Sequence, residues 1–554
     1  MNTKTLSLII LTILFTGCAQ PQHNAQSVSL IVKNANIYTL DAAHTTASVM
    51  IVDGERIIAV GDTALLEDYT SRNTLDVQGQ TVLPGFIDTH VHIEGVPPWY
   101  VDLTQVDSIA TLQQRLQAKA QELPADHWIT GYGWSEDEFA EQRKPTRQDL
   151  DAITPDNPVM FTRAGAHSAV FSSRALQLAG ISADTPDPEG GTIERNPDGS
   201  LNGIIRERHE QMVAHLLPTP DPADIRRSLA VELNKLFALG ITSITQATGT
   251  VDYFPQWEQV YAEQRGRLPR ASVQLAYAGQ QRMRDFGRRS GDGDHHLRVG
   301  PIKIFVDGGF TGPAAFTKEP YLNEATYRGH LNMPEHELRE LINLAHQDGW
   351  QMGIHAIGDA AIELVVDLLA DTLQQHPRAD HRHYLNHFTV MPSSETMQTM
   401  ADLGIAITQQ PNFAYTLEGR YEAYLGGERL AHNNPMASPM QHGIHVAMSS
   451  DILPLGPWVG IYAATTRKGM SGKVHGPEEK ISRVQALRAY TSKGAYLTRE
   501  EADKGQLTTG MLADFVVSTT DPFSVADDDL MGIQPAQTFL GGQLVFQQNQ
   551  SDNQ

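Results

Sequence analysis

The sequence predicts an α/β fold with parallel strands, arranged as a barrel or a doubly wound sheet, and a smaller β domain built from both chain ends. In the middle of the chain, strand-like and helix-like segments alternate, as at 299–306 (strand), 335–347 (helix), 350–355 (strand) and 360–373 (helix). Each helix returns the chain to the side where the next strand begins, so repeated units of this kind favour parallel strands.

Short β-branched segments separated by turns lie near both ends of the chain. The first group covers 30–32, 35–39, 48–52 and 56–60, and the second covers 515–517, 536–540 and 543–546. We expect the two groups to pair into one β-sandwich domain with boundaries 28–83 and 501–548.

The central domain is expected at 84–500, with an interruption at about 99–226. This stretch is rich in proline, glycine and charged residues. It is long enough to form an insertion domain that contributes to a lid.

Composition limits the classes of partner. The chain has 554 residues, 40% of them apolar, and a formal net charge of -23. This apolar content is ordinary for a globular protein. Phosphate binding needs clustered Lys and Arg, so the acidic balance argues against a nucleic-acid partner.

The first 18 residues look like an export signal with a lipid-attachment site. Lys4 precedes an apolar run over 6–15, which is too short for a stable membrane-spanning helix. The following Phe15-Thr16-Gly17-Cys18 resembles a bacterial lipoprotein cleavage site. We therefore expect an exported protein, anchored through Cys18 to a bacterial membrane and facing the periplasm or cell envelope. The alternative is an ordinary secretory signal with an incidental cysteine.

Cys18 is the only cysteine in the chain. The mature protein therefore has no disulfide, no thiolate metal ligand and no cysteine nucleophile. Any metal must be held by histidine, carboxylate or a less usual ligand.

The strongest chemical signal is His90-Val91-His92 at the end of a predicted strand. Alternate residues of a strand point to the same face, so the two imidazoles can bind one metal ion. A His-x-His pair alone is weak evidence, because surface or core histidines also produce it. The preceding Leu83-Pro84-Gly85-Phe86-Ile87-Asp88 makes the signal specific. The whole string resembles the opening strand of the amidohydrolase superfamily.

Further candidate ligands end later strands. His355 and His387 each close a β-like segment, about thirty residues apart, which fits one strand–helix unit. Asp451 closes the segment 444–451. Lys303 lies in a predicted strand whose interior-facing residues would be Lys303, Phe305 and Asp307. A buried lone ammonium tends to lose its proton, and a neutral amine can form a carbamate with carbon dioxide. The alternative is a lysine that reaches solvent or pairs with Asp307.

The resemblance extends from about residue 30 to 546 and is strongest to the branch that includes N-substituted formamide deformylase. Other strings that carry it are 129–134, 163–168, 189–193 and 409–411. It implies a distorted (β/α)8 TIM barrel, a β-sandwich and an insertion domain over the site. It also implies two zinc ions bridged by carboxylated Lys303, with His90, His92 and Asp451 on the first metal and His355 and His387 on the second.

The resemblance also implies a mechanism. A metal-bound hydroxide attacks an amide or formamide carbonyl, and Asp451 carries the proton to the leaving amine. Four further residues are candidate substrate contacts: Trp134, Arg163, His167 and Asp359. Three of them have a structural alternative, since Trp134 could lie in the core of the lid, Arg163 could form an ion pair and Asp359 could cap a helix. The remaining histidines are expected at the surface or in packing: His295, His296, His330, His381, His383 and His442.

Three departures from the family pattern argue against copying the substrate of any relative. Thr245-Gln246 replaces a frequent His-Asp, Asn386 replaces a usual Glu before His387, and Ile452-Leu453-Pro454 follows Asp451 in place of small polar residues.

Two alternative functions stay open at this point. One is a deaminase or cyclic-amide hydrolase on the same barrel, which typically uses one metal. The other is a non-catalytic, solute-binding surface lipoprotein, although the complete ligand set argues against lost catalysis. The expected partner is a small amide-type substrate. Contact with a membrane is expected only through the lipid anchor. Whether the protein forms a homodimer stays an open question at this point.

Overall fold

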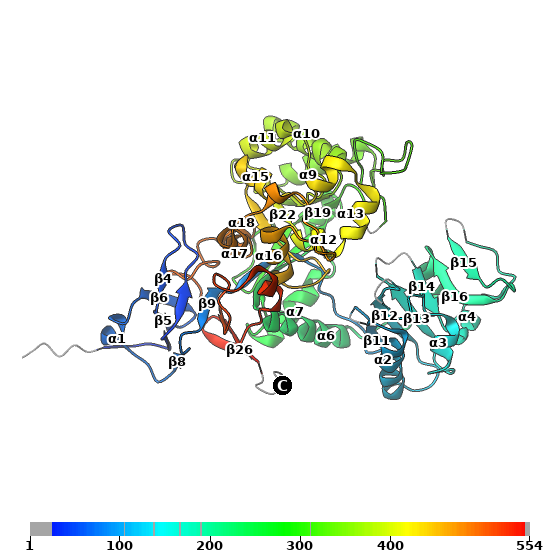
Figure 1. The fold of residues 1–554 in the computed structure, drawn as a ribbon, viewed down its shortest axis with the longest axis horizontal. Helices are drawn as coiled ribbons and strands as arrows, with labels where there is room; N and C mark the ends of the chain where they lie inside the picture. Colours follow the sequence, from blue (N-terminus) through cyan, green and yellow to red (C-terminus); the bar gives the residue numbers. More distant parts are fainter. Residues whose placement is uncertain are drawn as a thin grey trace, which may run out of the picture.

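A computed structural model describes residues 25–548, apart from 105, 137–138, 165–167, 189–190 and 311. The predicted signal peptide, Cys18 and His167 lie outside the described residues. Figure 1 shows a central barrel with a β domain on one side and a separate lobe on the other. Within the described part of the chain, no helix is long and apolar enough to cross a membrane.

Eight parallel strands form the barrel, and their order in space follows their order in sequence. They are β10 (Phe86–Val91), β17 (Ile241–Gln246), β18 (Arg270–Ala276), β19 (Leu297–Phe305), β20 (Met352–Ala356), β21 (Tyr384–His387), β22 (Ala406–Gln409) and β23 (Val446–Met448). A parallel bridge between Val91 and Asp451 joins the first strand to the end of the last. The predicted (β/α)8 barrel is therefore confirmed, in a nearly closed form.

Helices surround the barrel because each presents one apolar stripe to the strands. In α9 (Glu335–Gln347), the buried Leu338, Ile342 and Ala345 recur at intervals of four and three residues along one face. The other helices that follow barrel strands are α6 (Pro222–Lys235), α7 (Phe254–Gln264), α8 (Gln280–Asp285), α10 (Asp359–Gln375), α11 (Ser394–Leu403), α12 (Pro411–Thr416), α13 (Glu418–Tyr424), α14 (Gly427–Ala431), α15 (Ala437–Gln441), α16 (Pro457–Thr466), α17 (Arg483–Ala489) and α18 (Ser492–Leu497).

The β domain brings both ends of the chain into one sheet. Strand β24 (Phe515–Ser518) pairs with β9 (Thr81–Pro84) on one side and β25 (Gln537–Leu540) on the other. The same sheet contains β3 (Asn36–Tyr38), β4 (Thr46–Ala47) and β26 (Gln543–Gln547). A second sheet contains β2 (Leu30–Lys33), β5 (Val49–Asp53), β6 (Arg56–Gly61) and β8 (Thr74–Asp76). Apolar residues of both sheets share one core.

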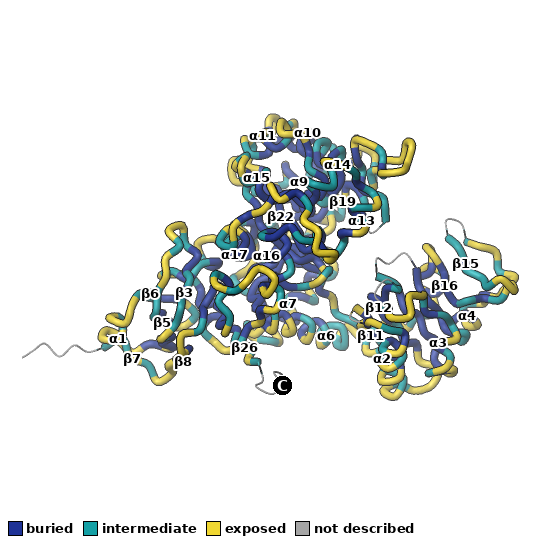
Figure 2. Tube along the Cα trace, viewed as in Figure 1, coloured by how far each residue is buried: buried dark blue, intermediate teal, exposed yellow. Residues whose placement is uncertain are grey.

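The separate lobe is inserted between β10 and α6. Its mixed sheet contains β11 (Tyr100–Asp102), β12 (Ile129–Trp134), β13 (Val159–Arg163), β14 (Ser168–Phe171), β15 (Thr192–Arg195) and β16 (Leu201–Arg206), packed with α2 (Ile109–Glu122), α3 (Arg147–Asp151) and α4 (Ser173–Leu178). The lobe stands apart from the barrel along the long axis of the molecule and has a buried interior of its own (Figures 1 and 2).

Two barrel strands end earlier than the sequence predicts. β19 ends at Phe305, so Asp307 lies beyond it. The Asp307 carboxylate accepts hydrogen bonds from the backbone N–H groups of Phe316, Ile357 and Gly358, which hold this segment outside the sheet. β23 ends at Met448, and Asp451 follows in a left-handed backbone conformation (φ 56°).

Candidate metal centre

His90 at the end of β10 and His92 just beyond it both lie close to Asp451. The Asp451 carboxylate is 3.5 Å from His92 Nε2 and 3.9 Å from His90 Nε2. One ligand atom from each of the three residues lies within 4.8 Å of the other two. Zinc ligands stand about 2 Å from the ion, so small movements would let the three residues share one cation.

Four imidazoles form a continuous row across the barrel mouth. Ring centroids are 5.4 Å apart for His92 and His90, 4.9 Å for His90 and His387, and 4.4 Å for His387 and His355. Strands β10, β20 and β21 supply them, at or just beyond their carboxyl ends. This is the end of the barrel where active sites of this fold are built.

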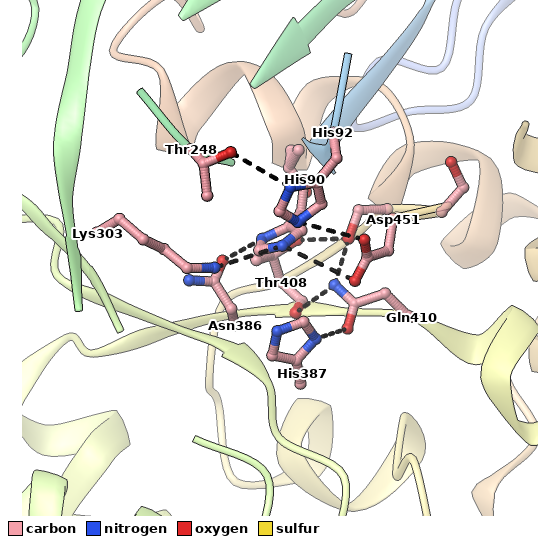
Figure 3. A network of polar contacts seen from close by, with 12 residues as sticks. His90, His92, Thr248, Lys303, Asn386, His387, Thr408, Gln410 and Asp451 are labelled. Atoms are coloured by element: carbon pink, nitrogen blue, oxygen red, sulfur yellow. Dashed lines mark hydrogen bonds and ion pairs between the residues drawn. The ribbon is translucent and has the colours of Figure 1, made fainter. Parts of the chain in front are cut away.

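Two buried amides orient two of these rings (Figure 3). His90 donates its Nδ1–H to Asn386 Oδ1 at 2.8 Å, and His387 donates its Nδ1–H to Gln410 Oε1 at 2.8 Å. Because Nδ1 carries the proton in each ring, Nε2 has a free lone pair. Ring orientation by a partner of this kind is typical of metal-bound histidines.

Lys303 reaches this row from β19 and is 4% exposed. Its Nζ lies 3.5 Å from His90 Nε2 and 4.7 Å from the centroid of the Phe305 ring. The Asp307 carboxylate is held by three backbone groups in the adjoining loops. The amine of Lys303 is therefore buried beside His90, and Asp307 has other partners; a metal-binding role for Lys303 stays a prediction.

Asp451 is held where the barrel closes. Its backbone N–H donates to His90 O at 2.9 Å. The preceding Ser450 donates its backbone N–H and its hydroxyl to the buried Asp88 carboxylate. A left-handed conformation is uncommon for a residue other than glycine. Asp88 and Ser450 thus fix the turn that directs Asp451 toward the histidines.

Burial sets the protonation of the centre. It lowers the pKa of His92 to about 4 and that of His355 to about 3, with a further lowering by the Lys303 charge. Burial also lowers the pKa values of His90 and His387 well below the usual range. Neutral imidazole is the form that binds metal ions. The four rings are therefore ready to act as ligands near neutral pH.

Burial acts in opposite directions on the two remaining groups. It lowers the pKa of the Lys303 amine and raises the pKa of the Asp451 carboxyl. These shifts favour an uncharged amine and a carboxyl group able to hold a proton.

The donor set fits one or two divalent cations. Four neutral imidazoles, a carboxylate and a buried amine surround one centre without any thiolate. His355 Nε2 is buried and has no hydrogen-bond partner among the described residues. A buried polar atom without a partner is costly, and a metal ion would remove that cost. His90, His92, Lys303, His355, His387 and Asp451 would hold the metal.

Three of the predicted substrate contacts form hydrogen bonds or ion pairs with other residues of the chain. In the separate lobe, Trp134 is fully buried and donates from Nε1 to Phe161 O at 2.8 Å. Arg163 pairs with Glu136, Nε to Oε2, at 2.6 Å. Asp359 begins α10 and accepts from the backbone N–H of Lys318 at 2.9 Å. A substrate role for these residues stays a prediction.

Several polar residues of the site have no role that the sequence predicts. Asn386 and Gln410 orient rings, and Thr248 Oγ1 lies 3.4 Å from His92 Nδ1. Asp88 is buried, which raises its pKa to about 7, although hydrogen bonds from Ser450 oppose that shift. The family-like strings already contained Asp88 and Gln410, but Thr248 stood in no recognisable pattern.

Comparison with known proteins agrees with this geometry. The model of the amidohydrolase family matches residues 73–546, which is most of the chain. The chain belongs to the amidohydrolase family. It is therefore a metal-dependent hydrolase.

This amidohydrolase is similar to one relative along its whole length and to two solved structures. It is 30% identical to the N-substituted formamide deformylase of Arthrobacter pascens over 551 residues, covering 95% of this chain and 100% of that protein. An uncharacterized metal-dependent hydrolase from Pyrococcus horikoshii shares the fold with a TM-score of 0.71 and 23% identity, covering 90% of this chain and 99% of the other. An uncharacterized metal-dependent hydrolase from Pyrococcus furiosus has a TM-score of 0.69 and 26% identity. That match covers 89% of this chain and 100% of the other.

Proposed function

We propose that this amidohydrolase cleaves a non-peptide C–N bond, in an amide or formamide, with two zinc ions bridged by carboxylated Lys303. The observation that carries the proposal is the convergence of six candidate ligands in one barrel mouth. The choice of bond is supported by the full-length similarity to a protein named N-substituted formamide deformylase.

Each residue has a task that follows from its position. Divalent cations bound here would lower the pKa of a water molecule to roughly 7 and polarise the scissile carbonyl. Asp451 accepts the proton of the attacking water and gives it to the leaving nitrogen. As the C–O bond forms and the C–N bond breaks, the products are a carboxylic acid and an amine. The raised pKa of Asp451 suits a group that must hold and release a proton near neutral pH.

The carboxylation of Lys303 is supported by its surroundings. The amine is buried and lies 3.5 Å from His90 Nε2, one of the histidines of the row. A neutral amine can add carbon dioxide, and the resulting carbamate would present two oxygens to two cations. Lys303 argues for two metals, whereas the one-metal deaminase alternative needs no carbamate.

The test is a panel of N-formyl and N-acyl amines, with the zinc-reconstituted enzyme and release of amine as the signal. We expect amine and carboxylate in equal amounts. Asp451→Asn should lower kcat/KM at least about 100-fold, because general acid–base groups contribute roughly 10²–10⁴-fold. Asp402→Asn, an exposed change on α11, is the matched control. Ammonia as the sole nitrogen product would favour a deaminase, and zinc-loaded protein inert on the whole panel would favour a solute-binding protein.

We propose further that the protein is exported and lipid-anchored through Cys18, with membrane contact only through the lipid. The support is the order of three features: Lys4, then the apolar run over 6–15, then Phe15-Thr16-Gly17-Cys18. Cys18→Ser should move the protein from the membrane fraction to the soluble or precursor fraction and abolish incorporation of labelled fatty acid. Unchanged membrane association of this variant would contradict the anchor. Cross-linking of the intact protein would test the homodimer.

A further inference from the structure

A second cluster of metal-ligating side chains lies far from the barrel mouth, where the β domain meets the barrel. Glu55 comes from the turn between β5 and β6, and the adjacent His295 and His296 precede β19. One ligand atom from each residue lies within 4.8 Å of the other two. The sequence predicts a surface or packing role for both histidines.

Backbone contacts fix all three positions. The carbonyl of Glu55 accepts from Ala513 N at 2.8 Å, and that of His296 accepts from Ala271 N at 2.8 Å. The carbonyl of His295 accepts from Arg270 Nη1 at 3.1 Å. The backbone of all three residues is therefore anchored, and a binding site is more precise when its residues are carried by rigid elements.

The ring of His296 is seated against Gly266. A Cβ atom at Gly266 would lie only 2.7 Å from His296 Cε1, so the glycine leaves the space that the ring uses. His296 Nδ1 is buried and has no partner among the described residues. A buried ring nitrogen without a partner is uncommon in proteins. A cation is one ligand that would satisfy it.

A different cluster shows the contrast. Glu418, Glu422 and His475 are equally close together. There the Glu418 carboxylate already accepts from Ser471 N and Ser471 Oγ, both at 2.8 Å, and from His475 Nε2 at 2.7 Å. Lys473 pairs with Glu422 at 2.7 Å. In the proposed cluster, His295 Nε2 lies 3.1 Å from Glu55 Oε2, but His296 Nδ1 has no partner among the described residues.

The local charge permits a cation next to Glu55. Arg270 Nη2 lies 3.7 Å from the Glu55 carboxylate. However, Arg270 is already neutralised by two hydrogen bonds to Asp514, at 2.7 and 3.0 Å. Arg270 therefore leaves the Glu55 carboxylate available to a cation, which would replace its present 3.1 Å hydrogen bond with His295 Nε2. Burial lowers the pKa of His296, and the nearby Arg270 lowers it further, which favours the neutral ring.

We propose that Glu55, His295 and His296 bind one zinc-class divalent cation, in a site separate from the barrel centre that ties the β domain to the barrel. Two imidazoles and one carboxylate are a ligand set that suits Zn²⁺, with water completing the tetrahedron. Zinc ligands about 2 Å from the ion are closer together than these atoms are now. The half-exposed side chains of Glu55 and His295 can make that movement.

The experiment compares zinc stoichiometry in the full protein at one buffered free-zinc concentration. His295→Ala, His296→Ala and Glu55→Gln should each bind one equivalent less than the natural protein and keep its hydrolytic activity. His336→Ala, which removes an exposed histidine from α9, is the matched control and should lose none. The zinc-induced rise in Tm should shrink in the three variants, because a ligand stabilises the state that binds it.

Two results would overturn the proposal. One is an unchanged zinc stoichiometry in Glu55→Gln and His295→Ala. Both side chains are half-exposed, so these variants keep their fold and a lower stoichiometry in them reports loss of a ligand. The other is an equal loss in His336→Ala, which would indicate scattered surface binding. His90→Ala should remove metal and activity together, so a failure of the barrel site is distinguishable from a failure of this one.

Discussion

At the scale of single residues, Asn386 and Gln410 perform the same task with one difference. Each accepts the Nδ1–H of one histidine at 2.8 Å. Gln410 also uses its NH₂ group, which donates to Ser449 Oγ at 2.7 Å. The NH₂ group of Asn386 is buried without a partner among the described residues. The acceptor oxygen, rather than the NH₂ group, is therefore what His90 needs.

We predict that Asn386→Leu weakens metal binding about 10–100-fold, the range typical when a partner of a metal-bound histidine is removed. The ring of His90 would lose the acceptor that keeps the proton on Nδ1. Asn386→Asp is the matched variant, since it keeps an acceptor oxygen for His90 and replaces the unpartnered NH₂ with a second, negatively charged oxygen; it should bind metal at least as tightly as the natural protein. Competition with a chelator measures the affinity. Equal affinities for Asn386→Leu and the natural protein would contradict this role.

At the scale of elements, α9 is joined to the segment before β21 by a pair of histidines. His346 Nε2 donates to His376 O at 2.7 Å, so its Nδ1 accepts from His383 Nε2 at 2.9 Å. His383 Nδ1 in turn accepts from Met352 N at 3.1 Å. Each of the four ring nitrogens takes part in a hydrogen bond, and Arg378 Nη2 also lies 3.5 Å from His383 Nε2. Neither ring can take a second proton without losing a hydrogen bond. Burial lowers the pKa of both, and the nearby Arg378 lowers both further.

This pair predicts a loss of stability in mild acid. The folded-state pKa values lie below 6.5, the value expected in the unfolded chain. Below about pH 6.5 the unfolded chain binds protons that the folded pair does not, so the free energy of unfolding falls as pH falls and is fully present only above that pH.

His346→Gln should lower the number of protons taken up on unfolding by about one. The pH dependence of urea unfolding between about pH 7.5 and 5.5 would measure it. His336→Gln on the same helix is the control. A pH dependence identical in the two variants would show that the pair does not titrate on unfolding.

The elements also show where sequence patterns predict structure well. The helix expected at 335–347 has those bounds as α9, since its apolar periodicity is regular. The strand expected over 444–451 is only Val446–Met448. Hydrogen bonds from Ser450 to Asp88, more than 360 positions away in the sequence, govern its end. Local patterns carry no information on such distant contacts.

At the scale of the whole molecule, the barrel and the β domain share a buried ion pair. Arg270 of β18 donates to both carboxylate oxygens of Asp514, and the two side chains are 1% and 5% exposed. Asp514 also accepts from Gly541 N at 2.8 Å. Removing one partner leaves an uncompensated buried charge, and that is strongly destabilising.

We predict that Asp514→Ala lowers the free energy of unfolding by about 3–5 kcal/mol. Asp371→Ala, which breaks the exposed pair with Arg339, should cost less than about 1 kcal/mol. Urea unfolding followed by far-UV circular dichroism compares the two. A similar decrease in the free energy of unfolding in both variants would contradict the prediction that the buried Arg270–Asp514 pair contributes more to stability than the exposed pair.

The amino-acid sequence by itself determined the fold class and the chemical inventory. Strand–helix alternation predicted parallel strands, in a barrel or a doubly wound sheet, and the resemblance to the amidohydrolase superfamily implied the barrel and the candidate ligands. Alternation and the family-like strings can both be recognised from residues that lie close together in the sequence. Tertiary structure decided which atoms meet: that Lys303 faces His90 and not Asp307, that amides orient two of the rings, and that Glu55 joins His295 and His296. These contacts connect residues tens to hundreds of positions apart, and they depend on how the whole chain packs.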